Sequence, residues 1–80
     1  MSKTDKLLDR LRHNPRDWRI EDLETIARSM GATIRNPRGS HVVFTHSSTD
    51  ALATIPVHKP IKPVYIRQFL AFLDAIQEHS

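Results

Sequence analysis

The chain of 80 residues contains no cysteine, so it has neither disulfide bonds nor metal sites built from thiolates. It also lacks any apolar run near the ~20 residues that a membrane-spanning helix needs. Charges are scattered through the first 17 residues, which therefore do not resemble the apolar region of a signal peptide. These absences predict a soluble protein of a reducing compartment, the cytoplasm, that forms a single domain over residues 1–80.

Acidic and aromatic residues are also few. Nine Asp and Glu stand against twelve Lys and Arg, which gives a formal net charge of +3 and a sequence pI of about 9.8. This balance favours a polyanionic partner, although charge alone is a weak indication. Trp18 and Tyr65 are the only residues of their types, and either can stack on a base. We expect instead that Trp18 packs the N-terminal helix onto the body and that Tyr65 packs at the start of the last helix.

Three segments have apolar residues at helical spacing. The first covers about residues 3–13, where three leucines form a narrow stripe before an Asn-Pro pair stops the helix. The second begins near Ile20, has acidic residues in its first turn and ends at a glycine cap, Gly31. The third begins at Pro63, continues to about residue 78 and carries the broadest apolar face.

Between the second and third helices lie three short segments rich in Val, Ile, Thr and Phe, which is typical of strands. The turns PRG and SSTD separate them, so we expect an antiparallel meander. The helices then cover one face of the sheet and leave the other face to a partner. This α+β order, α-α-β-β-β-α with a core unit over about 20–78, resembles the double-stranded-RNA-binding fold. The predicted strands are 32–36, 40–46 and 51–57.

One turn delivers a histidine to the start of the middle strand. In PRGSHVVFTHSS, an arginine, a glycine and a serine stand directly before His41. Because successive side chains of a strand point to opposite faces of the sheet, we expect His41 and Val43 on one face, and Val42 and Phe44 on the other. Histidine titrates near pH 6.5 in water, and metal-free RNA cleavage needs such a group to take the proton of a ribose 2′-OH. From the residue alone, a histidine that only forms hydrogen bonds is the more common alternative.

Two other chemistries fit this sequence less well. Ser40 beside His41 suggests a nucleophile and its base, but neighbours on a strand point to opposite faces, and no orienting acid is evident. His46 and His58 suggest, together with His41, a metal site, yet no metal-ligand spacing accompanies them. We therefore expect no metal site and no cofactor.

The basic residues divide into two groups. The arginines between residues 10 and 19 alternate with aspartates, and we expect them to form a solvated helix face. A second group flanks the turns and the entry to the last helix, where cations can stabilise the charge that develops on a phosphate. The residues expected to contact RNA are Arg35, Arg38, Gly39, Ser40, Lys59 and Lys62.

Several ordered features resemble the HicA family of small bacterial toxins. They are the helix LETIARSMGATI, the hairpin RGSHVVFTH, the strand end IPVH and the helix KPVYIRQFLAFL. The resemblance runs from about Leu7 to Ile76. Its most specific part is Gly39-Ser40-His41, followed about 14 residues later by the IPVH strand end and then by a helix that begins with proline.

The resemblance implies the toxin of a type II toxin–antitoxin pair. Such a toxin is an mRNA interferase that arrests growth and is neutralised by a HicB-type antitoxin. The family's catalytic histidine falls on His41 and its motif glycine on Gly39. We expect a monomeric free toxin whose basic surface around His41 is covered by an acidic antitoxin. Two alternatives stay open: a non-catalytic RNA-binding module of the same fold, and an interaction protein that pairs with an acidic chain.

Overall fold

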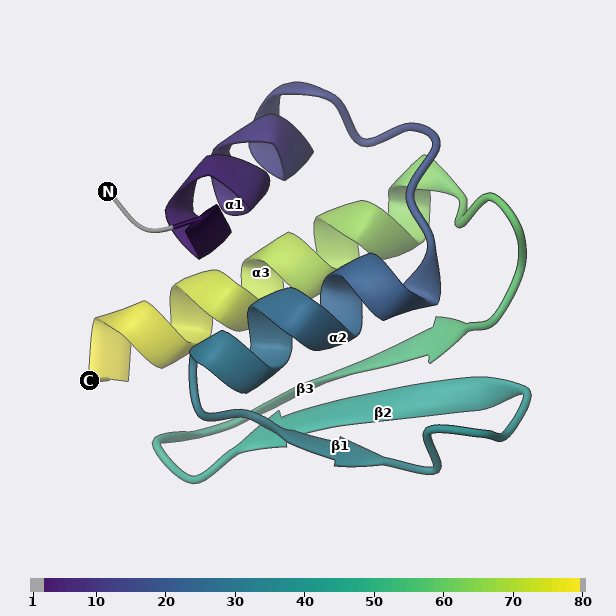
Figure 1. Ribbon diagram of the computed structural model, residues 1–80. Coiled ribbons are helices and arrows are strands. Elements are labelled where there is room, and N and C mark those ends of the chain that lie inside the picture. The colour runs from purple at the N-terminus through teal and green to yellow at the C-terminus, as the bar shows by residue number, and fades with distance from the viewer. Residues whose placement is uncertain (1–2, 80) are drawn as a thin grey trace.

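The computed structural model describes the backbone of residues 3–79 and the side chains of residues 5–78. Helices and strands follow one another in the order α-α-β-β-β-α (Figure 1), which confirms the predicted α+β class. The elements are α1 (Lys3–His13), α2 (Ile20–Ser29), β1 (Thr33–Arg35), β2 (His41–His46), β3 (Thr49–Pro56) and α3 (Pro63–His79).

The strands form one antiparallel sheet in the order β1-β2-β3, so the predicted meander is confirmed. Figure 1 shows α2 and α3 side by side over one face of this sheet, with α1 packed outside them. Within the described part of the chain, no element covers the opposite face, which we call the open face. No helix among the described residues is long and apolar enough to cross a membrane.

Alternation along β2 decides which face of the sheet is buried. Val42 and Phe44 lie fully buried beneath the helices, whereas His41 is exposed. Phe44 packs edge-on against Phe69 of α3, with ring centroids 5.0 Å apart and planes at 68°. Such aromatic pairs contribute about 0.5–1.5 kcal/mol beyond the area that they bury. This packing fixes the register of β2 against the helices and sends His41 to the open face.

A linker of residues 14–19 holds α1 against the body. The indole of Trp18 is only 6% exposed, and its Nε1 donates a hydrogen bond to the Asn14 carbonyl oxygen at 2.5 Å. Arg12 of α1 forms an ion pair with Asp74 of α3 at 2.6 Å. Trp18 therefore packs the N-terminal helix onto the body, as predicted.

The hairpin between β2 and β3 differs from the prediction. β3 begins at Thr49, inside the segment SSTD that the pattern assigned to a turn, and only Ser47 and Ser48 connect the strands. His46 pairs directly with Thr49. The turn is closed by the His46 ring, whose Nδ1 accepts a hydrogen bond from the Ser48 N–H at 3.0 Å. Of the polar segment SSTD, Ser47 and Ser48 therefore form a two-residue turn, and Thr49 and Asp50 belong to β3.

Candidate functional site

His41 is the first residue of β2 and lies on the open face. Its Cα partner across the β2–β3 ladder is Pro56, and the N–H of the next residue, Val57, donates to the Ser40 carbonyl oxygen at 2.9 Å. The backbone on both sides of His41 is therefore fixed by the sheet. Its imidazole is exposed to solvent, on the face that the alternation predicted.

The turn before β2 is held together by one asparagine. Asn36 adopts a left-handed conformation with φ of 56°, and its carbonyl oxygen accepts a hydrogen bond from the Gly39 N–H at 3.0 Å. Its side chain crosses the turn, where Nδ2 donates to the His41 carbonyl oxygen at 3.0 Å. Because Asn36 and Ser40 belong to this turn, β1 and β2 are shorter than the predicted strands 32–36 and 40–46.

Asn36 also explains why residue 39 is a glycine. A Cβ on Gly39 would overlap with the Asn36 side chain, at a separation that real side chains do not adopt. A larger residue at position 39 would therefore displace the amide that fixes the backbone of His41. Sequence reasoning did not single out Asn36, because its spacing from His41 has no recognisable pattern. The one signal available in the sequence was the residue type, because Asn adopts a left-handed φ in turns more readily than most residues.

The prediction that Ser40 and His41 point to opposite faces is wrong. Ser40 precedes the strand, so strand alternation does not apply to it, and its Oγ lies 3.2 Å from Nδ1 of His41. Among residues 5–78, no hydrogen-bond partner lies at Nε2 of His41, and no carboxylate lies at ion-pair distance from its ring. A serine nucleophile would need an acid to orient the histidine. The described residues provide none there.

The sheet register places two polar neighbours beside His41. Arg35 of β1 and Thr54 of β3 both pair with Val43, from opposite sides. Each is therefore diagonal to His41 on the open face, where such neighbours lie about 7–8 Å apart, and both are exposed. Arg35 is one of the predicted RNA contacts. Thr54 was missed, because alternation alone does not give the register between two strands.

The other predicted cations lie in the turns at the same end of the sheet. Arg38 is exposed in the turn before β2, next to Gly39. Lys59 and Lys62 lie in the loop between β3 and α3, where they line surface hollows together with linker residues. The structure thus divides the predicted cations into two groups. Arg35 and Arg38 lie near His41, and the two lysines lie further round the same end of the molecule.

The remaining histidines of the sheet region do not form a metal-type group with His41 among the described residues. His46 lies at the opposite end of β2, where Nδ1 accepts from the Ser48 N–H and Nε2 lies 3.2 Å from the Met30 carbonyl oxygen. His58 is exposed beyond the end of β3. No group of three or more His, Cys, Asp or Glu side chains within the described residues has the arrangement of a metal site.

The fold and this site together define a small α+β protein that presents one histidine, flanked by cations, on an uncovered sheet face. The family model described as "HicA toxin of bacterial toxin-antitoxin" matches residues 20–74, which is more than half of the chain. The chain therefore belongs to the HicA toxin family, as its sequence motifs predicted. Curated proteins and solved structures yield no significant match. Helix α1 and the whole linker of residues 14–19 precede the matched residues.

Proposed function

We propose that this HicA-family protein is an endoribonuclease that cleaves mRNA, with His41 as its acid–base residue. Members of the family are generally RNases. The observation that carries the proposal is an exposed imidazole whose Nε2 has no hydrogen-bond partner among the described residues, on a strand beside Arg35 and Arg38. An imidazole in this position can reach a substrate without breaking any contact of the fold.

In the proposed reaction, the His41 imidazole takes the proton from a ribose 2′-OH. The 2′ oxygen attacks the adjacent phosphorus, and the bond from phosphorus to the 5′ oxygen breaks. The departing 5′ oxygen takes up a proton, so the products are a 2′,3′-cyclic phosphate and a 5′-OH. General acid–base catalysis of this kind contributes about 10²–10⁴-fold in rate.

Cations around His41 supply the electrostatic part of the proposal. Arg35 is diagonal to His41 on the open face, and Arg38 lies in the turn that leads to it. No carboxylate among the described residues is paired with either guanidinium, so both are available to a phosphate. Gly39 and Ser40 connect Arg38 to His41, and we include them in the RNA-binding surface. Positive charge there stabilises the charge that develops on the phosphate.

The family also implies a cognate antitoxin. We propose that this antitoxin is acidic and covers the open face. Besides the arginines, this face exposes Leu52, whose side chain is 57% accessible, and part of Val43. A partner with carboxylates and a few apolar groups matches this mixture, and charge attraction would speed the encounter. Covering His41 would exclude RNA without any change in the fold of the toxin.

Expression in a bacterial host, without a partner, tests the proposal. We expect growth arrest with loss of mRNA, and we expect His41→Ala to abolish both at an equal soluble level. The antitoxin should still bind His41→Ala protein, because loss of one imidazole removes little interface area. Equal toxicity of the alanine variant would contradict the catalytic role of His41. RNA binding without any cleavage by the wild-type protein would favour the alternative, a non-catalytic RNA-binding module.

A further inference from the structure

A group of four cations lies where the linker between α1 and α2 meets the loop between β3 and α3. Two of them belong to the linker and two to the loop. The Ile61 N–H donates to the Trp18 carbonyl oxygen at 2.9 Å, which fixes the two segments against each other. We call these four residues the linker cation cluster: Arg16, Arg19, Lys59 and Lys62.

The cluster lines two neighbouring surface hollows. Arg19 and Lys59 line one of them, Arg16 and Lys62 line the other, and Asp17 lines both. All four cations are exposed, and none of them is in an ion pair with a carboxylate of residues 5–78. The cluster therefore keeps most of its positive charge, opposed by Asp17 in both hollows and by the Asp22 carboxylate, which accepts a hydrogen bond from the Arg19 N–H at 3.1 Å.

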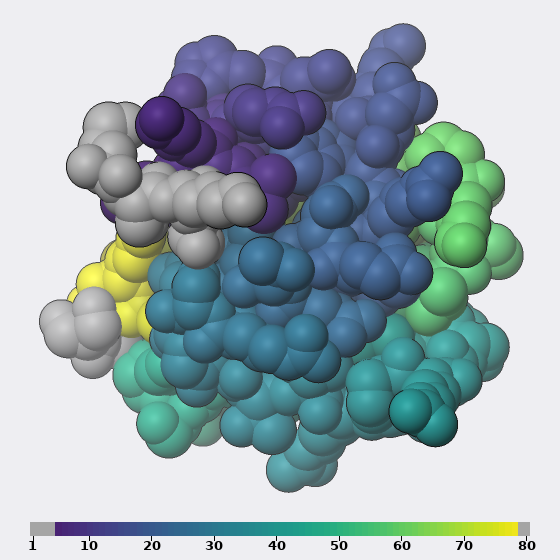
Figure 2. All heavy atoms as spheres, in the orientation of Figure 1, coloured from purple at the N-terminus to yellow at the C-terminus, as the bar shows by residue number. Residues whose placement is uncertain are grey.

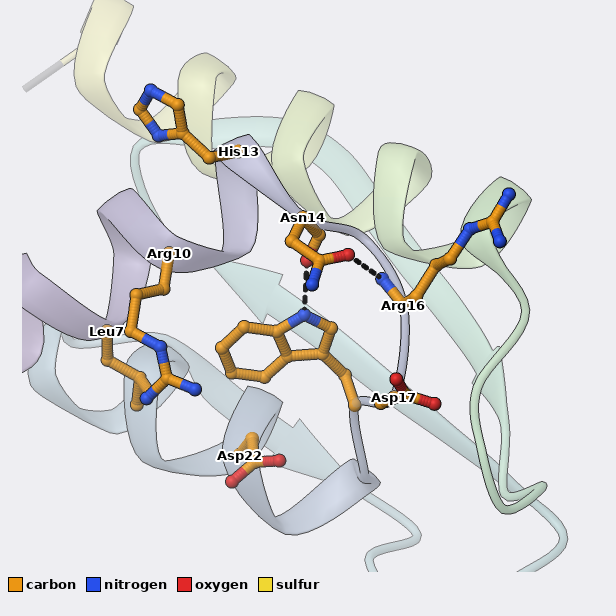
Figure 3. A pocket seen from close by; sticks show the side chains of 8 residues that line it. Leu7, Arg10, His13, Asn14, Arg16, Asp17 and Asp22 are labelled. Carbon is orange, nitrogen blue, oxygen red and sulfur yellow. Dashed lines mark hydrogen bonds between the residues drawn. The ribbon is translucent and has the colours of Figure 1, made fainter.

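Two arginines near Trp18 show how the cluster differs from the cations that support α1 (Figure 3). The guanidinium of Arg10 lies over the indole, 5.5 Å from the ring centroid, so its charge contributes to packing. Arg16 extends away from the indole, on the side of the start of α3. The prediction of one solvated helix face for the arginines between residues 10 and 19 is thus wrong for Arg16 and Arg19, because α1 ends at His13 and α2 begins at Ile20.

The cluster is continuous with the site around His41. Pro56 is the strand partner of His41, and Lys59 follows Pro56 by three residues. An extended chain of three residues spans at most about 10 Å. On the right-hand side of Figure 2, the green β3–α3 loop lies between the blue-violet linker and the teal region of the β1–β2 turn. A polyanion with one phosphate at His41 can therefore continue across this loop to the linker.

We propose that the linker cation cluster binds the phosphate backbone of the RNA substrate beyond the cleavage site, so that the N-terminal linker forms part of the substrate-binding surface. The proposal rests on the proposed ribonuclease function. Unpaired cations gain affinity for nucleic acid through counterion release. The hollow of Arg16 and Lys62 is also lined by Pro60, Ile61 and Pro63, of which Ile61 is only 1% exposed. Because the core of a protein–protein interface is apolar, a protein partner is the competing occupant that the test must separate from RNA.

The test measures RNA affinity in protein that carries His41→Ala, so that the RNA stays intact. The probe is a single-stranded RNA of about 15 nucleotides, within the usual site sizes of such surfaces. Each phosphate contact contributes about 0.7 to the slope of log affinity against log salt, which is roughly fivefold in affinity at 0.1 M salt. We expect Arg16→Gln with Arg19→Gln to weaken binding about 25-fold and to reduce the slope by about 1.4.

Two control variants make the test specific. Arg28→Gln removes one arginine charge at the far end of α2, where Arg28 is paired with Glu24, and should leave RNA affinity unchanged. Asp17→Asn removes the opposing carboxylate and should strengthen binding. Asn tolerates the left-handed φ of 64° at position 17, so this change should not disturb the linker.

The outcomes separate this proposal from the function on which it rests. If the double variant binds RNA as its parent does while Arg38→Glu binds more weakly, the cluster does not contact RNA but the proposed function stands. If no variant binds RNA at all, both proposals fail. If the double variant loses only affinity for the antitoxin, the cluster belongs to a protein interface and the proposal is wrong. With His41 intact, the double variant should raise KM and leave kcat unchanged.

Discussion

The two ends of β2 each carry a histidine, and the two rings have opposite surroundings. His46 is half-buried, and its Nδ1 accepts from the Ser48 N–H at 3.0 Å. Because Nδ1 is the acceptor, the proton resides on Nε2, which donates to the Met30 carbonyl oxygen at 3.2 Å. His41 is exposed, and only its Nδ1 has a hydrogen-bond partner among the described residues, the neighbouring Ser40 hydroxyl.

This difference shows how one strand uses the same side chain in two ways. A proton transfer at His46 would break a hydrogen bond that connects the β2–β3 hairpin to the end of α2. A proton transfer at the Nε2 of His41 breaks nothing in the fold. The backbone of His41 is nevertheless fixed by Asn36 and by the ladder to β3. General acid–base catalysis requires a positioned group that can exchange a proton. Of these two histidines, only His41 combines a fixed backbone with a ring nitrogen that has no partner among the described residues.

The largest expected effect concerns cleavage rate. His41→Ala should lower the rate of RNA cleavage by about 10²–10⁴-fold, because the proton acceptor is lost. His46→Ala should leave the rate of the folded protein within a few fold of wild type. Steady-state cleavage of a labelled RNA checks both variants, at a temperature where circular dichroism shows each to be folded. Equal loss of activity in the two variants would remove the distinction drawn between the two rings.

The next effect tests how His41 is held. Gly39→Ala should lower the cleavage rate by about 10²-fold, because a misplacement of about 1 Å has that effect on a catalytic group. Its methyl group would displace the Asn36 side chain. Asn36→Gly removes the obstacle and tolerates the left-handed φ. A double-mutant cycle should therefore show that Gly39→Ala costs little activity once Asn36 is replaced. Additive losses would mean that the glycine acts in some other way.

A smaller effect concerns the stability of the other end of β2. His46→Ala should lower the free energy of unfolding by about 1–3 kcal/mol, because it leaves the Ser48 N–H and the Met30 carbonyl without their partner. Urea denaturation measures this change. His46→Asn should recover part of the loss, since its Oδ1 can take the place of Nδ1 as acceptor for Ser48. His41→Ala, by contrast, should change stability by no more than about 0.5 kcal/mol, as exposed positions usually do.

The smallest effect is on substrate affinity. Arg38→Glu should weaken binding to all RNA sequences alike, since a phosphate contact carries no sequence information. Removing that contact should lower the slope of log affinity against log salt by roughly 0.7. Fluorescence anisotropy at several salt concentrations, in protein that also carries His41→Ala, measures this slope. An unchanged slope would make Arg38 a turn residue without a role in binding.

The sequence predicted the parts of the fold that depend on local pattern. Helical spacing gave the three helices, and alternation in HVVF sent His41 to the open face while Val42 and Phe44 entered the core. Contacts between distant residues were not predictable. The hydrogen bond from His46 to Met30 spans 16 residues, and the one from Ile61 to Trp18 joins two loops.

The candidate site was likewise predicted only where it depends on local sequence pattern. The motif Gly39-Ser40-His41 was found from its order in the sequence, but the contact between Ser40 and His41 was wrongly excluded, because the pattern extended the strand by one residue. Thr54 depends on the register between β2 and β3. Asn36 acts through a side chain that crosses a turn. None of these follows from residue spacing, because register and turn geometry are set by the packing of the whole chain.

The chemistry of cleavage in the presence of EDTA tests the central claim most directly. Purified wild-type and His41→Ala proteins are each given a defined RNA, and the ends of the products are identified. We predict that the wild-type protein cleaves in EDTA and leaves 2′,3′-cyclic phosphate or 3′-phosphate ends with 5′-OH partners. His41→Ala should be nearly inactive, and RNA with a 2′-deoxy sugar at the cleaved position should stay intact. Activity that disappears in EDTA and returns with magnesium or zinc, or an alanine variant as active as wild type, would contradict the assignment of His41.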